Sequence, residues 1–105
     1  AWVTPGGLLE EGETVLDGLR REVREEVGLE VVEPNLTRIL QQTLTDATRV
    51  RHGYFAQFVV QAVSADVRPG RGIREARWFD HLPETLAFRE DYRRDFETLR
   101  RGASF

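Results

Sequence analysis

The segment from Thr14 to Gly28 constrains the fold of this chain more than any other. Its apolar residues recur every three or four positions, as on one face of an α-helix. They are Leu16, Leu19, Val23 and Val27. Thr14 is suited to cap the start of such a helix, with Asp17 three residues later, and Gly28 to the left-handed position that ends it. The segment therefore predicts an amphipathic helix ending near Val27, in which Gly18 allows close packing on a sheet.

Three glutamates occupy another face of this helix. Glu22, Glu25 and Glu26 follow the spacing i, i+3, i+4, which places them side by side. Like charges four residues apart on a helix repel by a few tenths of a kcal/mol. Carboxylates in the last turns also interact unfavourably with the negative end of the helix dipole, at a cost of roughly 0.3–1 kcal/mol each. Locally unfavourable arrangements of this kind tend to mark functional sites. A hard divalent cation such as Mg²⁺ prefers oxygen ligands and would turn the repulsion into binding.

A solvated acidic face is the alternative interpretation of the three glutamates. Basic residues are interleaved with them and could neutralise their charge. These residues are Arg20, Arg21 and Arg24. The helix alone does not distinguish a metal site from a solvated face, so the residues around it are needed for the interpretation.

A longer pattern surrounds the acidic residues. It reads Gly7, five residues, Glu13, seven residues, Arg21-Glu22, an apolar residue, any residue, Glu25-Glu26, any residue, Gly28 and an apolar Leu29. This pattern resembles, position for position, the signature sequence of the Nudix hydrolases. Trp2 and the Pro5-Gly6-Gly7 turn are similar to the usual entry of that family into its signature.

The resemblance implies a fold and a function. The implied fold is α/β, an α/β/α sandwich with a mixed sheet. The implied function is hydrolysis of a diphosphate bond in a nucleoside diphosphate linked to another group, with Mg²⁺ or Mn²⁺ as the cofactor. Substrates in the family include nucleoside triphosphates, nucleotide sugars, dinucleotides and ADP-ribose, so the expected partner is a nucleotide-like small molecule.

The resemblance also assigns roles to individual residues. Glu22 and Glu26 are the expected primary metal ligands, and Glu25 either joins them or acts as the general base through a water. The Gly6 carbonyl is a further expected ligand. Arg21 is expected to orient a glutamate through a bidentate ion pair, and Glu13 commonly pairs with that arginine.

One departure from the family pattern puts the general base in doubt. The segment Ile73-x-x-Ala76-x-Trp78 resembles the last strand of Nudix domains, and many members place a glutamate immediately before its isoleucine. Here that position is Gly72. Glu75 is a candidate replacement, and a structural ion pair is the alternative for it.

Candidate substrate contacts lie outside the signature. Arg51, Tyr54 and Phe55 could contact a base, ribose or phosphate, with packing as the alternative. Arg71, flanked by Arg68 and Arg74, could clamp a diphosphate, with a solvated loop as the alternative. His52 fits no metal-ligand pattern.

The remaining segments predict a mixture of strands and one more helix. We expect the end of a strand at 1–4, an extended exit at 29–32, a turn at 33–35, strands at 36–45, 50–65 and 73–80, a hairpin connection at 46–48 and a loop at 66–72. In the 50–65 strand both faces carry apolar residues, which predicts a central strand packed on both sides. A helix is expected at 86–101, with an inward face of Phe88, Tyr92, Phe96 and Leu99.

Composition limits the classes of function. The 105 residues suffice for one domain with a modest core, and the net charge of −3 disfavours broad binding to nucleic acids or membranes. All 15 basic residues are arginine and there is no cysteine, which excludes lysine chemistry, disulfides and thiolate metal sites. No apolar run approaches the ~18 residues of a membrane span and no leader pattern is present, so we expect a cytoplasmic protein.

The domain organisation is expected to be a single Nudix domain over residues 1–105. The sequence contains no methionine, and the strands that normally precede the Pro-Gly-Gly entry are missing. We therefore expect the N-terminal part of the fold to be incomplete and residues 102–105 to form a flexible tail. A homodimer is possible, since dimers are common among relatives.

Two other functions stay open on the sequence alone. A non-catalytic sensing or scaffold domain would keep the fold without needing all its carboxylates. Action on capped or triphosphorylated RNA is disfavoured by the acidic balance and by the lack of a basic patch.

Overall fold

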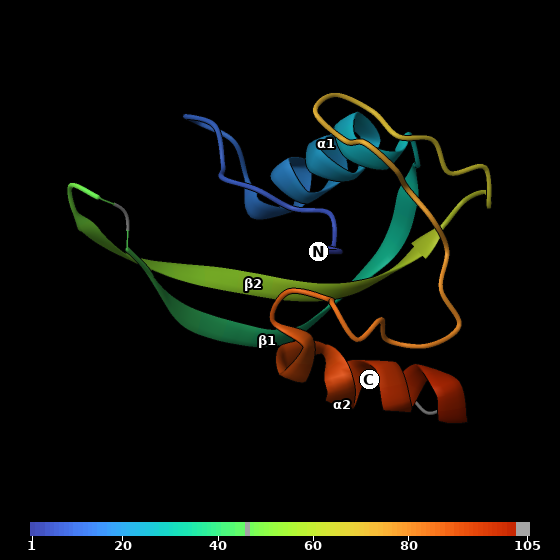
Figure 1. The fold of residues 1–105 in the computed structure, drawn as a ribbon. Coiled ribbons are helices and arrows are strands. Elements are labelled where there is room, and N and C mark those ends of the chain that lie inside the picture. The colour runs from blue at the N-terminus through green and yellow to red at the C-terminus, as the bar shows by residue number, and fades with distance from the viewer. Residues whose placement is uncertain (46, 103–105) are drawn as a thin grey trace.

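The computed structural model describes residues 1–45 and 47–102. It contains four elements, which are α1 (Val15–Val27), β1 (Val31–Thr45), β2 (Val50–Ala62) and α2 (Arg89–Arg101) (Figure 1). Residue 46 of the expected hairpin connection and residues 103–105 of the expected tail lie outside the described part. The fold class is α/β, as predicted.

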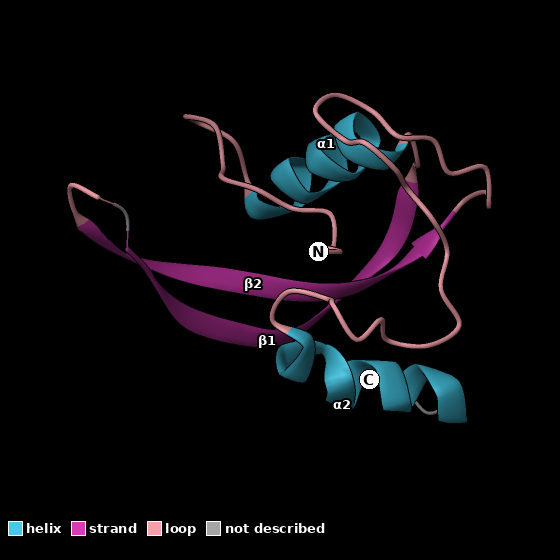
Figure 2. Cartoon of the chain, viewed as in Figure 1, coloured by secondary structure: helices cyan, strands magenta, loops and turns pink. Residues whose placement is uncertain are grey.

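The two helices lie on opposite sides of a sheet built from β1 and β2 (Figure 2). The strands pair in antiparallel fashion from Val31 opposite Ala62 to Thr45 opposite Val50. Within residues 1–45 and 47–102 this is the whole sheet, so the mixed sheet and the complete sandwich implied by the resemblance are not confirmed. The expected N-terminal strand is reduced to a single parallel bridge between Trp2 and Leu86.

The turn predicted at residues 33–35 is wrong, because the chain continues there as one strand. The pairing register shifts between Val32 and Asn35, which is the signature of a bulge. Glu33 adopts a left-handed φ of 52° and precedes Pro34, which has no N–H to give to the ladder. The turn-forming residues are thus absorbed as a bulge, and the two predicted segments at 29–32 and 36–45 form β1 together.

β2 is shorter and less enclosed than predicted. It ends at Ala62 rather than at residue 65, and it has one hydrogen-bonded neighbour among the described residues. Its C-terminal half packs against the core through Val60 and Ala62, whereas Tyr54 is exposed near its start. The prediction of a central strand is therefore wrong, because the sheet carries no second partner beside β2 in the described chain.

The hydrophobic core is small and lies between the C-terminal half of α1 and the sheet. Val23, Leu29 and Val31 are its buried residues. Partly buried residues pack around them, namely Leu19, Val27, Val60, Ala62 and Val67. Most of the predicted helical stripe is confirmed, but Leu16 is exposed because the core reaches α1 only from Leu19 onward.

α2 begins three residues later than predicted. Trp2 explains the delay, because its N–H donates to the Thr85 carbonyl at 3.2 Å and its carbonyl accepts from the Ala87 N–H at 2.8 Å. These bonds hold the preceding residues in a bridge to the N-terminal segment. Phe88 then turns the chain into the helix with a left-handed φ of 56°.

Polar groups hold α2 on the sheet together with part of the predicted apolar face, of which Tyr92 and Phe96 are half-buried. Phe88 and Leu99 are 55% and 53% exposed, so their assignment to an inward face is wrong. Asp95 is the buried residue of the helix at 7% exposure. It accepts hydrogen bonds from the Thr37 hydroxyl and from Gln57 Nε2, the latter at 2.7 Å. These directed bonds set the rotation of α2 and leave part of its apolar face in solvent.

The strand predicted at residues 73–80 is also wrong, since this segment is an irregular connection. Its aromatic side chains find other partners. Phe79 packs edge-on against Trp2 with ring centroids 4.8 Å apart, and Trp78 Nε1 donates to the Ala65 carbonyl at 2.9 Å. No helix of the described chain has the length and apolar character needed to cross a membrane.

The small core makes a clear stability prediction. Val23→Ala should lower the free energy of unfolding by about 2 kcal/mol, because Val23 is buried at the centre of the core. Val15→Ala in the same helix is the matched control, because Val15 is exposed, and it should change stability little. Urea unfolding measures both, and equal losses in the two variants would contradict this location of the core.

Candidate active site

The helix that carries the acidic residues is capped as predicted at both ends. The Thr14 hydroxyl accepts a hydrogen bond from the Asp17 N–H at 3.1 Å. Gly28 ends the helix with φ 71° and ψ 20°, and its N–H donates to the Arg24 carbonyl at 3.0 Å. The boundaries of α1 therefore follow from local sequence, and they fix which side chains share a face.

Glu22 and Glu26 form a carboxyl pair on this face. The pKa of Glu26 is raised to about 7, first by burial, then by a hydrogen bond with Glu22 and by the negative charges of Glu22 and Glu25. A hydrogen bond from the Gly6 N–H to Glu26 Oε1, at 3.3 Å, opposes this rise. Glu26 therefore titrates near neutral pH rather than in the acidic range of an ordinary carboxyl group.

The glycine-rich N-terminal segment lies directly against this pair. A Cβ added to Gly7 would fall 2.6 Å from Glu22 Oε1, closer than real side chains approach. Gly6 contacts the other carboxyl group through its N–H. The Pro-Gly-Gly turn is thus a close approach of backbone to the acidic face. The expected metal ligation by the Gly6 carbonyl stays a prediction.

Arg21 ties the preceding loop to the helix. Its guanidinium makes a bidentate ion pair with Glu13, with Nε to Oε2 at 2.6 Å and Nη2 to Oε1 at 3.0 Å. Nη2 also donates to the Leu8 carbonyl at 3.1 Å. The hydrogen bond from Arg21 lowers the pKa of Glu13, and the same bond raises the pKa of Arg21. Both groups are therefore charged throughout the neutral range.

The same guanidinium reaches two of the three expected metal ligands. Arg21 Nη1 lies 3.0 Å from Glu22 Oε1 and 3.2 Å from Glu25 Oε2. Glu22 thus contacts both Glu26 and Arg21, whereas Glu25 contacts Arg21. Among residues 1–45 and 47–102, no group of three acidic or histidine side chains surrounds a common metal position.

The Glu22–Glu26 pair nevertheless fits a hard cation. Its donors are carboxylate oxygens, which Mg²⁺ and Mn²⁺ prefer. Burial and the neighbouring carboxyl groups of Glu22 and Glu25 raise the pKa of Glu26 to about 7. A divalent ion held by Glu22 and Glu26 would favour the ionised carboxylates and would displace a proton, as metal binding to acidic ligands generally does.

The structure does not gather the predicted substrate contacts in one place. Residues alternate faces along β2, so Tyr54 lies on the side opposite to Arg51 and Phe55. Arg71 lies at the C-terminal end of α1, where its N–H donates to the Glu25 carbonyl at 3.1 Å. Figure 1 shows the 50–55 segment toward the hairpin turn, on the other side of the molecule. Each contact stays a separate prediction.

Gly72 and Glu75 explain the departure from the family pattern in structural terms. Gly72 has a left-handed φ of 73°, a conformation that a glutamate would adopt only with strain. Glu75 Oε2 lies 2.8 Å from Arg77 Nη2 on the surface. The ion pair proposed as the alternative role of Glu75 is therefore present.

Sequence reasoning missed the backbone N–H groups of Gly6, Gly70 and Arg71 that bond to the acidic turn, because every residue except proline carries such a group. It also misplaced the partner of Gly18, which packs against the Leu9 side chain and Glu13 Oε1 of the loop rather than against the sheet. The signal for this contact was the glycine itself, since a glycine inside a helix often marks a close neighbour.

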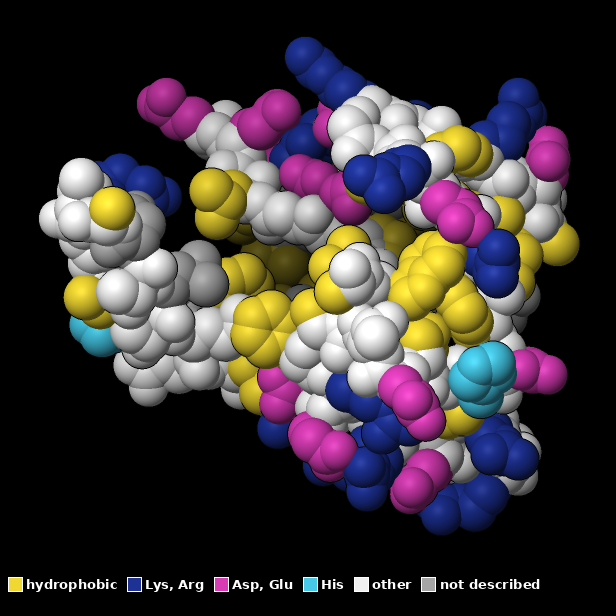
Figure 3. Space-filling view, in the orientation of Figure 1, with side chains coloured by type: hydrophobic (Ala, Val, Ile, Leu, Met, Phe, Trp, Pro, Cys, Tyr) yellow, Lys and Arg dark blue, Asp and Glu magenta, His cyan; other side chains and the backbone are white. Residues whose placement is uncertain are grey.

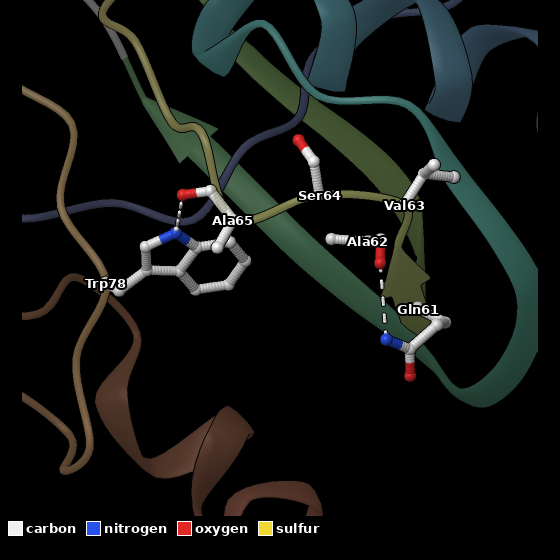
Figure 4. Close-up of a pocket in the computed structure, with 6 residues that line it drawn as sticks. All are labelled: Gln61, Ala62, Val63, Ser64, Ala65 and Trp78. Atoms are coloured by element: carbon white, nitrogen blue, oxygen red, sulfur yellow. Dashed lines mark hydrogen bonds between the residues drawn. The ribbon is translucent and has the colours of Figure 1, made fainter.

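Two hollows differ in their chemistry. Figure 3 shows acidic side chains at the rim of an apolar hollow between the N-terminal segment and the β1–β2 hairpin. An open cavity of about 420 Å³ lies beyond the end of β2, where the Trp78 ring faces residues 61–65 (Figure 4). No acidic residue lines this second cavity. The hollow beside the acidic residues is thus the better candidate for a metal-dependent site.

The Arg21 contacts predict a difference between two arginines. Arg21→Lys should lower the urea midpoint more than Arg24→Lys, because lysine cannot reproduce the bidentate fork or the bond to the Leu8 carbonyl. Arg24 is the matched control, because it makes a similar bidentate pair with Glu30. Both side chains of that pair are more than half exposed, whereas the exposed fractions of the Arg21 and Glu13 side chains are 18% and 11%. Equal effects would show that burial of the Arg21 pair does not matter.

The raised pKa of Glu26 predicts a pH dependence of stability. Its pKa is higher in the folded chain, so protonation favours folding. This contribution is complete below about pH 4.5 and is lost as the pH rises through about 7. Glu26→Gln should therefore flatten the fall in stability of the metal-free protein between these values, measured by urea unfolding. Glu11→Gln, at an exposed position, should keep the parental slope, and an unchanged slope in Glu26→Gln would contradict the assignment.

Comparison with known proteins identifies the family of this chain. The chain matches the NUDIX domain family over residues 1–100. It is 30% identical over 84 residues to the uncharacterized Nudix hydrolase YvcI of Bacillus subtilis (strain 168), covering 75% of this chain and 51% of the relative. It is 28% identical over 100 residues to the ADP-ribose pyrophosphatase of Methanocaldococcus jannaschii, covering 93% and 58%. The chain spans about half the length of these curated relatives. It belongs to the Nudix family.

Proposed function

We propose that this chain hydrolyses a diphosphate bond in a nucleoside diphosphate linked to another group, with Mg²⁺ or Mn²⁺ as its cofactor. The observation that carries the proposal is the Glu22–Glu26 carboxyl pair, which the Gly6-Gly7 backbone contacts directly and in which the pKa of Glu26 is raised to about 7. Such a pair binds a divalent ion more readily than a solvated acidic face, because its two groups are already held together.

Each acidic residue has a distinct role in the proposal. Glu22 and Glu26 hold the metal, and the Gly6 carbonyl completes the protein ligands. When bound, the metal neutralises phosphoryl charge and lowers the pKa of a bound water. Arg21 keeps the loop and the helix in register through Glu13 and turns one oxygen of Glu25 toward itself. Glu25 serves as a further ligand or accepts a proton from the attacking water.

The substrate is proposed to be a nucleotide-like small molecule. ADP-ribose is the first compound to test, because the relative from Methanocaldococcus jannaschii is named an ADP-ribose pyrophosphatase. Arg51, Tyr54, Phe55 and Arg71 stay candidate contacts, of which Arg51 and Phe55 share one face of the sheet. The cytoplasmic location and the homodimer stay predictions.

Substitution of the carboxyl pair tests the proposal. Glu22→Gln and Glu26→Gln should each lower turnover by about 100-fold or more while the fold is retained, because the amide keeps the shape of the side chain and removes its charge. Turnover is measured in the full-length protein as release of a nucleoside monophosphate or nucleoside diphosphate from ADP-ribose, a nucleotide sugar, a dinucleotide and a nucleoside triphosphate, with Mg²⁺ or Mn²⁺. Circular dichroism verifies the fold.

Glu11→Gln is the matched control and should keep parental turnover, since Glu11 lies exposed outside the pair. Parental activity in both Glu22→Gln and Glu26→Gln would refute the assigned role. Nucleotide binding without turnover by the parent on the whole panel would identify a sensing domain instead.

A further inference from the structure

A loop distant in sequence covers the C-terminal end of α1 (Figure 1). Three of its backbone N–H groups donate to carbonyls in the last helical turn. Arg68 donates to Val27 at 2.9 Å, Gly70 to Glu26 at 2.9 Å and Arg71 to Glu25 at 3.1 Å.

These bonds complete the hydrogen bonding of the helix end. The last four carbonyls of a helix lack partners within it and usually bond to water or to residues just beyond the end. Here Gly28 serves the Arg24 carbonyl, and residues 68–71 serve the other three. The last turn of α1 is thus held by a segment that follows β2 in the chain. This is the turn that carries Glu25 and Glu26.

Gly70 makes this contact possible. A Cβ at this position would overlap the Glu25 carbonyl oxygen and lie 2.9 Å from the Glu25 carbonyl carbon. The obstacle is backbone, which cannot rotate away as a flexible side chain could. Gly72, two residues later, would meet nothing within 4 Å. Any side chain at position 70 must therefore move the loop away from the helix. A side chain at position 72 is strained by the left-handed φ of 73°, but it contacts nothing.

We propose that Gly70 is a positioning residue for the metal site. The loop bonds the backbone of Glu25 and Glu26, and in this way it fixes where the Glu26 carboxylate stands relative to Glu22. A helix end without partners frays in its last turn, which would separate the two carboxylates. The inference rests on the proposed metal-dependent function, and it adds that residues 68–71 set the affinity for the divalent ion.

The proposal has a reciprocal consequence. If the loop raises the affinity for the ion, then the ion must stabilise the contact of the loop by the same coupling free energy. Binding of Mg²⁺ should therefore slow hydrogen exchange at the Gly70 and Arg71 amides in the parent protein. The Ala87 amide, which donates to the Trp2 carbonyl, serves as the reference and should not change.

The experiment combines these two readouts. The Mn²⁺ affinity of the parent, Gly70→Ala and Gly72→Ala is measured by electron paramagnetic resonance, with circular dichroism as the check on folding. Gly70→Ala should weaken Mn²⁺ binding about tenfold, the lower end of the range for groups that position metal ligands. Gly72→Ala is the control for backbone strain in the same loop. Its left-handed φ of 73° makes any side chain strained, but its Cβ contacts nothing within 4 Å, so it should weaken Mn²⁺ binding less than Gly70→Ala does.

The outcomes separate this inference from the proposed function. A parent that binds no Mn²⁺ contradicts the metal-dependent function itself. A parent that binds Mn²⁺ with the same affinity as a folded Gly70→Ala variant overturns the role of Gly70 alone. If Gly70→Ala does not fold, hydrogen exchange in the parent protein decides. The inference is then overturned if the Gly70 and Arg71 amides exchange at the same rate with Mg²⁺ as without it.

Discussion

The ion pair between Arg21 and Glu13 is the contact on which the site depends. It joins a loop that has no regular secondary structure to the helix that carries the acidic face. The bond from Arg21 to the Leu8 carbonyl holds the same loop at a second point. Because this loop leads back to Gly6 and Gly7, the arginine also determines how closely the N-terminal backbone lies on the Glu22–Glu26 pair. A planar guanidinium with five donors suits this task, since one side chain can satisfy carboxylate and carbonyl oxygens at once.

The parts of the fold that could be predicted from sequence are those determined by neighbouring residues. Thr14, Gly28 and the apolar spacing between them define α1, and all of these signals act within one or two helical turns. The parts that could not be predicted depend on contacts between distant residues. Trp2 bonds to Thr85 and Ala87 and so delays the start of α2, although nothing near residue 86 signals it. Residues 73–80 have the composition of a strand, but a strand needs a partner, and Phe79 packs against Trp2 instead.

The candidate site likewise has a part that could be predicted from the sequence and a part that could not. Helical spacing alone places Glu22 and Glu26 side by side, and the family resemblance assigns Arg21 its partner Glu13. The contact of Arg21 with both Glu22 and Glu25 could not be foreseen, because it depends on which carboxylates one guanidinium reaches in the folded chain. The donors from residues 68–71 are backbone groups, so the residue types at these positions do not indicate the contact. Only Gly70 indicates it in the sequence, because a side chain there would overlap the helix.

The burial of Asp95 has a consequence for how α2 is seated. Apolar contact is non-directional and tolerates sliding of a helix along its axis or rolling about it, whereas hydrogen bonds tolerate neither. Asp95 engages Thr37 and Gln57, and the Asp91 carbonyl accepts from Arg38 one helical turn earlier. A shift of α2 by a single residue would break all of these bonds together. The helix therefore has one permitted register on the sheet, selected by geometry rather than by the area of its contact.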